Sequence, residues 1–573
     1  MGDIPLGSLF SAFNIAQSGL TAAQIQLDTA GHNIANATKD GYSRQRVGLV
    51  SRQSINIGPG RIGTGVAVSG IERVRDEFLD GLFQEQVAGL GFAEFRAEMF
   101  QQIEDIFLEP SENGLSARLN LFFDSLNEFA ANVESIPVRQ SVLTEAEALA
   151  SVLNDTSSRL RAVRTSANDQ IKNTVPVING LSERITALNK AIVAQEIAGK
   201  TANDLRDERT ALMDELGQLV NIFSRERDNG LVDILVSGEV LVDGFEYREL
   251  EAVPNAALDP DRNDLVEIRF VSTGTLLNPK SGEVAGALSI RDQTVLEIDD
   301  DINVIAATII EQINKIQSQG NGISDFSAPL IASNPVSDPT LALNSAGLPF
   351  TVSNGTFEIN VFDAAGVPSG TSPVTITIGA ATTLNDVIGQ INADPDLTAS
   401  VDASGFLTIS SAANTTFGFA NDATNFLVAT GTNVLFTGND ARTIGVSQLL
   451  LDSPELLASA YDTDPLNTGD NKAANDFLEV QNGLYLIGGT ASVNDYYESM
   501  IVGIGVDARS NVDNLDLERT FVESFDRRRQ EISGVSLDEE VAFLIQYQRA
   551  FEASARVISV TDRMLDALFS IAL

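Results

Sequence analysis

The amino-terminal stretch of the chain carries a long apolar repeat. Its apolar or small positions alternate at spacings of three and four residues, and they are Leu6, Leu9, Phe13, Ala16, Leu20, Ala23, Leu27, Ala30 and Ile34. Such spacing keeps a narrow stripe on one side of a helix, as in a coiled coil. Cap- and turn-forming residues follow, among them Asn36, Thr38 and Gly41. The pattern therefore predicts a helix that ends near Ile34 and a turn around Gly41.

The carboxyl-terminal stretch repeats this pattern. The alternating positions there are Leu544, Tyr547, Phe551, Ser554, Ile558, Thr561, Leu565 and Leu568, with Leu537 one heptad upstream. Acidic residues at Asp538, Glu539 and Glu540 fall in the first turn, where the helix dipole favours negative charge. Each stripe needs a partner, so we predict that the two end helices pair with each other. Separate docking of each helix on a globular core is the alternative.

The two stripes together predict an assembly interface. Its residues are the large side chains of the two seams: Leu6, Leu9, Phe13, Leu20, Leu27, Ile34, Leu544, Tyr547, Phe551, Ile558, Leu565 and Leu568. Because both stripes are narrow and lie at opposite ends of the sequence, they suit a helix pair that meets further copies of itself.

Helical stripes also occupy much of the chain between the ends. They cover residues 71–107 and 138–220, and Pro176 is expected to break or kink the second run. Two β-type runs then flank Ser237 and Gly238, and an alternating strand pattern follows at 266–270, which predicts a small β insertion at about 226–290. Isoleucines from Ile298 to Ile316 predict another helix, ending in the region of Gly320.

Residues 321 to about 440 have a different character. They are rich in Gly, Ser, Thr, Asn and Ala, with almost no basic residues. Alternating runs at 357–361 and 374–378 predict strands, residues 401–409 predict a hairpin about Ser404 and Gly405, and residues 384–391 predict one short helix. We therefore expect a β-rich module at 326–438 inserted into a helical protein.

Composition narrows the possible partners. The chain has 573 residues, 43% of them hydrophobic, and 37 basic against 79 acidic residues give a net charge of -42. Such a chain repels phosphate backbones and anionic lipid headgroups, so neither nucleic acid nor a membrane is an expected partner. The amino terminus has no positively charged segment of signal-peptide type, and no eighteen-residue apolar run occurs. Cysteine is absent, which suits either an intracellular protein or one that travels unfolded.

Candidate chemistry is sparse. His32 is the only histidine and lies off the apolar stripe, so a surface or helix-end role is favoured over catalysis. AQEIAGKT, residues 194–201, follows a helical stripe rather than a strand, and Gly199 is expected to end that helix before a solvated Lys200. GPGRIG, residues 58–63, precedes a strand pattern and reads as a β turn, while DPDRND, residues 259–264, lacks the glycine and glutamate of a calcium loop. No catalytic, cofactor-binding or metal-ligating residue is predicted.

Four segments carry a resemblance to a known family. GHNIANATKDGYSRQRV, residues 31–47, resembles the amino-terminal motif of bacterial flagellar axial proteins, which include rod, hook and hook-associated components. SGVSLDEEVAFLIQYQRAFEASARVISVTDRMLDAL, residues 533–568, is similar to their carboxyl-terminal segment in its hook-associated form. Residues 115–160 and 202–222 resemble internal helices of the same group. Lys39 and Asp40 stand where many relatives have Thr-Pro, a departure that concerns the local loop.

This resemblance implies a structural subunit that joins the flagellar hook to the filament. It implies four partners: hook protein, hook-associated protein 3, a ring of identical subunits, and an export chaperone on the carboxyl-terminal helix. It also implies type III export to the extracellular flagellum without a cleaved signal peptide. Another axial subunit, hook protein or flagellin, is the closest alternative. A secreted carbohydrate-binding protein is a more distant one, because the chain has no Trp and residues 321–440 have no Tyr.

The expected fold is mainly α with β-rich insertions, arranged as an elongated multidomain rod with paired amino- and carboxyl-terminal helices. Three domains are predicted. Residues 1–36 and 533–573 form a terminal coiled-coil assembly domain, residues 37–325 and 439–532 form a helical rod domain with the small β insertion, and residues 326–438 form an outer β-rich domain.

Overall fold

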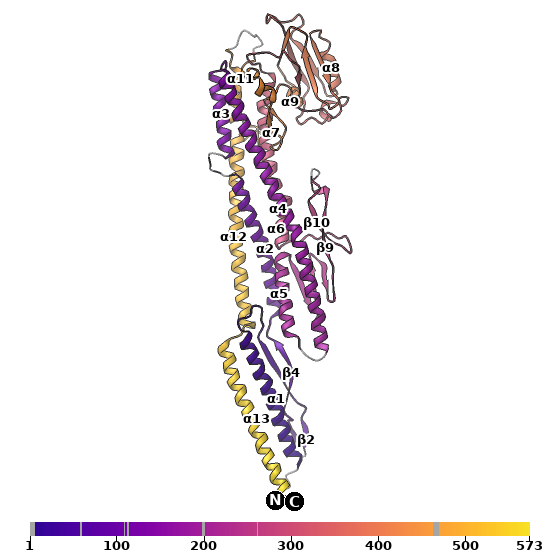
Figure 1. Cartoon of the computed structure of the whole chain (residues 1–573), viewed down its shortest axis with the longest axis vertical. Helices are drawn as coiled ribbons and strands as arrows, with labels where there is room; N and C mark the ends of the chain where they lie inside the picture. Colours follow the sequence, from indigo (N-terminus) through magenta and orange to yellow (C-terminus); the bar gives the residue numbers. More distant parts are fainter. Residues whose placement is uncertain are drawn as a thin grey trace. The chain divides into compact units, whose positions relative to one another are not determined.

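A computed structural model describes residues 6–57, 60–107, 109, 111, 114–197, 201–259, 262–461 and 469–572 (Figure 1). The chain divides into two compact units. The first contains residues 1–98, 166–290 and 510–573, and the second contains residues 99–165 and 291–509. Three helices contribute to both units: α2 (Glu77–Phe107), α4 (Ile136–Ile197) and α12 (Val493–Ser533). The mainly helical class with small separate sheets, predicted from the sequence, is confirmed.

The first unit combines helices with short antiparallel strands. Its other helices are α1 (Leu6–Asn36), α5 (Asn203–Leu219), α6 (Glu283–Ser289) and α13 (Leu537–Ala572). Its strands are β1 (Gln45–Ser51), β2 (Ile55–Ile57), β3 (Gly60–Ile62), β4 (Val66–Arg73), β5 (Ile222–Glu226), β6 (Val232–Val236), β7 (Glu239–Asp243), β8 (Glu246–Tyr247), β9 (Leu250–Pro254) and β10 (Val266–Phe270). The turn between β6 and β7 uses Ser237 and Gly238 at φ of 53° and 87°, the left-handed conformation that two-residue hairpins require.

The second unit contains the β-rich module. Its other helices are α3 (Leu115–Ala131), α7 (Val295–Gln319), α8 (Leu384–Ile391), α9 (Phe426–Thr430), α10 (Gln448–Asp452) and α11 (Lys472–Asn482). Its strands are β11 (Leu330–Ile331), β12 (Gly355–Asp363), β13 (Val374–Ile378), β14 (Leu397–Val401), β15 (Leu407–Ser411), β16 (Thr415–Ala420), β17 (Phe436–Thr437) and β18 (Gly445–Val446). They pair in the orders β13-β12-β16, β11-β15-β14 and β17-β18.

The elements predicted for residues 321–440 are confirmed. The runs at 357–361 and 374–378 lie in β12 and β13, and α8 covers the predicted short helix. The hairpin of β14 and β15 turns at Gly405, which has φ of 90° and lies so close to the Val336 backbone oxygen that a Cβ would be 2.2 Å from it. Only glycine fits this position. The predicted division into three domains stays a prediction.

Four local predictions can be compared with the structure. Helix α1 ends at Asn36, two residues beyond the expected Ile34, and Gly41 forms the predicted turn with φ of 74°. Helix α7 ends before Gly320, as expected. Of the break or kink expected at Pro176, the break is wrong, because α4 continues through that residue. Pro176 lies on the exposed side of α4, and Val175 and Ile178 beside it are buried, so packing compensates for the missing amide hydrogen.

Candidate assembly interface

Helices α1 and α13 lie side by side in the first unit, as the sequence predicted (Figure 1). Two contacts give their direction. The Asn33 side chain bonds to Glu540, and Gly19, fourteen residues earlier in α1, faces Ser554, fourteen residues later in α13. The helices are therefore antiparallel. A Cβ at Gly19 would lie 3.0 Å from the Ser554 Oγ, so small residues at this level allow the two helices to approach closely.

The centre of the seam is built from small side chains. Ala16, Ala23 and Ala30 of α1 are buried, and Thr561 of α13 is buried as well. The large residues of the predicted interface lie partly buried beside them, and they are Phe13, Leu20, Leu27, Ile34, Leu544, Tyr547, Phe551, Ile558 and Leu565. The side chains of Leu6, Leu9 and Leu568 lie outside the described residues. The helix pair alone therefore leaves part of each large side chain open to further contacts.

Two further groups of exposed apolar side chains on α13 were not predicted. Leu537, Val541 and Ile545 form one group and Val557, Val560 and Met564 form the other, each residue between 46% and 51% exposed. At about 100° per residue the two groups lie on opposite flanks of the seam, so they do not form one stripe. Leu537, one heptad upstream of Leu544 in the predicted pattern, is 51% exposed. The signal for the first group was present in the four-residue steps from Leu537 to Ile545, but the stronger alternation of the seam obscured it. Clusters of exposed apolar side chains are typical of protein contact sites.

The motif at residues 31–47 forms a buried polar cluster at one end of the seam. We call it the Glu540 cluster, and its members are Asn33, Tyr42, Arg44, Glu539 and Glu540. Glu540 is 3% exposed and accepts hydrogen bonds from Asn33 Nδ2 at 3.1 Å and Arg44 Nε at 2.8 Å. Arg44 also pairs with Glu539 at 3.0 Å. The cluster thus ties the loop after α1 to the first turn of α13.

His32 has a structural role at the edge of this cluster. Its Nδ1 lies 2.9 Å from the Tyr42 hydroxyl, which donates to Asn33 Oδ1 at 2.8 Å. Burial and the carboxylates of Asp204, Asp207 and Glu540 raise the pKa of Tyr42, so the hydroxyl keeps its proton. Since that proton points to Asn33, Nδ1 of His32 is the donor of the other bond. This arrangement orients the turn that follows α1.

A second cluster, the Asp207 cluster, anchors the start of β1 and the end of β4 to α5. Asp207 is buried and accepts bonds from the Ser43 backbone amide at 3.0 Å, the Ser43 hydroxyl at 2.6 Å and Arg73 at 2.9 Å. Arg75 donates to the Ser43 hydroxyl at 3.0 Å and holds Asp80 of α2 with two nitrogens, at 2.7 and 2.8 Å. Buried carboxylates satisfied in this way stabilise one relative placement of the elements that carry them.

Arg529 of α12 closes this group of ion pairs. It donates to Asp214 of α5 at 2.8 Å and lies 4.0 Å above the Phe83 ring. Burial raises the pKa of Asp214, and the Arg529 charge opposes that rise. Arg529 therefore joins α12 to α5 by charge and to α2 by stacking.

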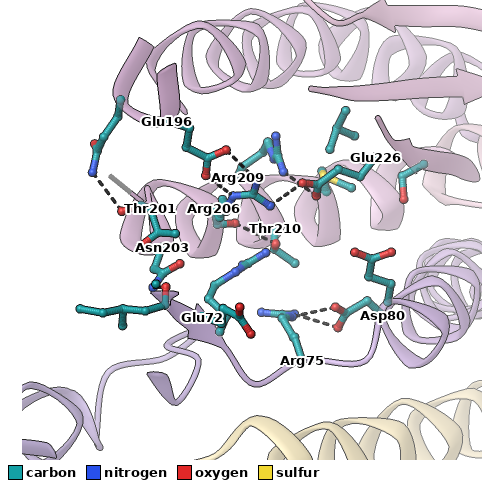
Figure 2. Close-up of a pocket in the computed structure, with 18 of the residues that line it drawn as sticks. Glu72, Arg75, Asp80, Glu196, Thr201, Asn203, Arg206, Arg209, Thr210 and Glu226 are labelled. Atoms are coloured by element: carbon teal, nitrogen blue, oxygen red, sulfur yellow. Dashed lines mark hydrogen bonds and ion pairs between the residues drawn. The ribbon is translucent and has the colours of Figure 1, made fainter. Parts of the chain in front are cut away.

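Figure 2 shows a pocket of about 890 Å³ between β4, α5 and the start of α2. Its arginines are held by carboxylates of its own wall. Arg206 pairs with Glu196 at 2.8 Å and with Glu226, and Arg209 pairs with Glu226 at 2.9 Å. Burial lowers the pKa of Arg209 to about 10, which still leaves it charged near neutrality. Because these charges are already neutralised, the pocket wall is better suited to holding α5 against β5 than to binding an ion.

The sequence motifs weighed as chemical sites behave as structural elements. Ile55 pairs with Ile62 in the β2–β3 hairpin around GPGRIG, although Gly58 and Pro59 lie outside the described residues. Residues 194–197 are the last residues of α4. Gly199 and Lys200, whose roles were predicted from the sequence, also lie outside the described residues. Asp264 is bound by Arg262 at 2.7 Å. Among the described residues, no group of three or more His, Asp or Glu side chains could hold a metal ion, and no helix is long and apolar enough to cross a membrane.

Three family models match the chain. "Flagella basal body rod protein" matches residues 13–42, "Flagellar hook-associated protein FlgK helical domain" matches residues 100–327, and "Flagellar basal body rod FlgEFG protein C-terminal" matches residues 528–571. The first and last cover most of α1 and α13, which form the seam. In these three segments the chain is similar to flagellar axial proteins.

Full-length relatives make this similarity more specific. Flagellar hook-associated protein 1 of Salmonella typhimurium is 29% identical, covering 98% of this chain and all of the relative. The proteins of that name from Escherichia coli and Bacillus subtilis are 28% and 27% identical, each covering 98% of this chain. The similarity to flagellar hook-associated protein 1 that was recognised in the sequence is therefore confirmed.

A solved structure supports the fold. "The structure of the flagellar hook junction protein FlgK from Burkholderia pseudomallei" aligns with a TM-score of 0.50 at 16% identity. The alignment covers 80% of this chain and all of that one. At this identity the likeness concerns the fold alone.

Proposed function

We propose that the chain is a structural subunit that joins the flagellar hook to the filament and assembles as a ring through its terminal helices. The observation that carries this proposal is the antiparallel pair of α1 and α13. Its seam leaves the large side chains partly open, and exposed apolar residues of α13 flank the seam on both sides. A helix pair with exposed apolar side chains in and beside its seam suits repeated contacts between identical subunits around an axis.

The proposed partners follow from the family resemblance. Hook protein lies on one side of the ring, hook-associated protein 3 lies on the other, and an export chaperone holds α13 before assembly. The protein reaches the extracellular hook–filament junction through the flagellar type III channel. Its lack of cysteine suits an unfolded passage, since no disulfide can form on the way. The proposed role is adhesive and needs no catalytic group.

Deletion of the gene tests this function. We expect cells with complete hooks, no attached filaments and filament protein in the medium, and we expect the full-length gene to restore filaments. Immunogold labelling should place the protein in a narrow band at the distal end of the hook. Label along the hook or along the filament would contradict the junction role and would support the alternatives, hook protein and flagellin respectively. Filaments that stay attached in the deletion strain would contradict all three.

A further inference from the structure

Strands β1 and β4 form a two-stranded ribbon with one covered face. The strands pair from Gln45 opposite Arg73 to Ser51 opposite Val66, and within the described part of the chain neither pairs with any other strand. The covered face packs on α1, where Val47 is buried and the Val66 amide donates to the Ser18 hydroxyl at 3.2 Å. The other face of the ribbon is therefore available for contacts, whereas its edges are partly used, by Asn33 at the Gln45 backbone and by Asn203 at the Ile71 oxygen.

Apolar side chains are exposed at several positions of the ribbon and its hairpin. Because side chains alternate along a strand and Val47 faces α1, Val50 lies on the open face and Leu49 lies on the same face as Val47, at the groove. Leu49 and Val50 of β1, and Ile55 and Ile62 of the adjoining β2–β3 hairpin, are between 43% and 50% exposed. Strand pairing uses backbone hydrogen bonds, so it does not explain why four aliphatic side chains are exposed here. A groove of about 730 Å³ lies beside β1, and its opposite wall carries the stacked rings of Phe543 and Tyr547. The ribbon and this groove form one continuous surface with the α1–α13 pair.

The ribbon is also basic in a strongly acidic protein. Seven of the 37 basic residues, but two of the 79 acidic residues, fall between Lys39 and Arg75. Arg44, Arg73 and Arg75 are used in the two clusters described above. The remaining arginines are Arg46, Arg52 and Arg61. Each is exposed, and none makes an ion pair with a described residue. Arg46 faces Glu72 across the ribbon without reaching ion-pair distance.

We propose that the open face of this ribbon is a second docking surface between copies of the chain, which receives an acidic surface of the neighbouring copy. The inference rests on the proposed ring. Arginine next to aliphatic and aromatic side chains is the composition of an interface core rather than of a solvated surface. Because each copy carries a net charge of -42, copies repel one another, and a basic ribbon against an acidic neighbour offsets that repulsion at close range.

Site-specific photo-crosslinking in intact flagella tests the proposal. We would place p-benzoylphenylalanine at Val50 of the full-length chain and identify the crosslinked product by mass spectrometry. A product of two copies of this chain, joined from Val50 to a peptide rich in Asp or Glu, is expected. Crosslinks to a different flagellar protein, or no crosslink in flagella that assemble normally, would overturn the proposal. If the variant does not assemble, the same probe is placed at Ile62.

A pair of charge variants provides the matched control. Arg52→Glu with Arg61→Glu should reduce the crosslinked fraction several-fold and should loosen filaments under shear. Arg159→Glu with Arg184→Glu changes the net charge equally, at exposed positions of α4, and should leave both readouts unchanged. Equal effects of the two pairs would show that total charge, not the ribbon, is responsible. If two copies crosslink through the ribbon but the deletion strain keeps its filaments, the docking surface would be supported. Only the junction function would then be contradicted.

Discussion

At the scale of single residues, the most constrained group of the first unit is the Glu540 carboxylate. It is buried against two donors that come from the loop after α1 and from α1 itself, namely Arg44 and Asn33. Glu539, the neighbouring residue, pairs with the same arginine, but its side chain is 59% exposed. Two adjacent glutamates therefore contact one arginine in very different surroundings, which makes them a natural comparison.

We predict that Glu540→Ala weakens the α1–α13 pair far more than Glu539→Ala. Loss of Glu540 leaves a partly buried guanidinium without its main acceptor, which costs on the order of 3 kcal/mol. Loss of the exposed Glu539 should cost less than about 1 kcal/mol. Native-state hydrogen exchange of the α13 amides measures both values as changes in the free energy of local opening. Equal losses in the two variants would show that burial does not distinguish these carboxylates.

Asp325 in the second unit gives a prediction about pH. Burial raises its pKa to about 6, and its hydrogen bond from Thr416 at 3.4 Å only partly opposes this rise. In the unfolded chain the same carboxyl ionises near pH ~4. The folded state therefore binds the proton more tightly, and the contribution of Asp325 to stability is lost as pH rises from about 4 through about 6.

Calorimetry of the wild type and of Asp325→Asn can isolate this contribution. We expect the variant to gain stability relative to the wild type as pH increases across that interval, because asparagine has no proton to lose. Thr416→Val is a useful companion, since removing the donor should raise the pKa of Asp325 further and widen the interval. A difference between Asp325→Asn and the wild type that does not change with pH would contradict the assignment.

At the scale of elements, the regular spacing of apolar residues predicted the helices and strands whose formation depends on local sequence. The seam residues of α1 and α13, the isoleucine stripe of α7 and the alternating strands β12 and β13 are all visible as regular spacing. The clusters were not predictable in this way, because Ser43 meets Asp207 across 164 positions of the chain. Nothing in the spacing of polar residues indicates such a contact. Pro176 shows the opposite case. A proline inside a helix is a strong local signal for a break, but α4 continues through it because residues beside it are buried.

We predict that a charge on the α13 seam abolishes assembly. Phe551→Asp or Ile558→Asp places a carboxylate at a partly buried seam position, where it has no partner and disfavours contacts with α1 and with neighbouring copies. Motility should be lost and filament protein should appear in the medium, while circular dichroism of the purified protein stays close to the wild type. Gln548→Asp, at an exposed position of the same helix, is the control and should swim. Normal filaments in both seam variants would show that this stripe is not an assembly surface.

At the scale of the whole molecule, the predicted limits of the β-rich module can be compared with its contacts to the helix before it. Sequence composition placed its limits at 326 and 438, but the structure shows that residues near the second limit pack on α7. The Asn314 side chain accepts bonds from the Leu435 and Phe436 amides, and Gln317 donates to Asn433 at 3.0 Å. Composition could not reveal this, because these residues resemble the module and yet complete the surface of α7.

Two deletions of different width test the dispensability of the module. Replacing residues 335–421 with a Gly-Ser linker removes the contact of β16 with α7 but spares the hydrogen bonds of Asn433, Leu435 and Phe436 to that helix. Loop closure depends only weakly on linker length, so this protein should be secreted and should retain filaments. Replacing residues 326–438 removes those contacts and should lower the melting temperature of the second unit. A narrow deletion that folds and is secreted but releases filaments would show that the module carries a junction contact.

The pairing of α1 with α13 also determines at which stage of synthesis and folding the seam can form. Asn33 and Glu540 are 507 positions apart, so the contact between them cannot form until nearly the entire chain is present. Long-range contacts of this kind form late in folding, after local helices and hairpins. A chain cut short by premature termination or by a protease keeps α1 but has no helix to set against it. Completeness of the polypeptide is thus a condition for forming the seam, and a truncated copy lacks the helix pair on which the proposed ring depends.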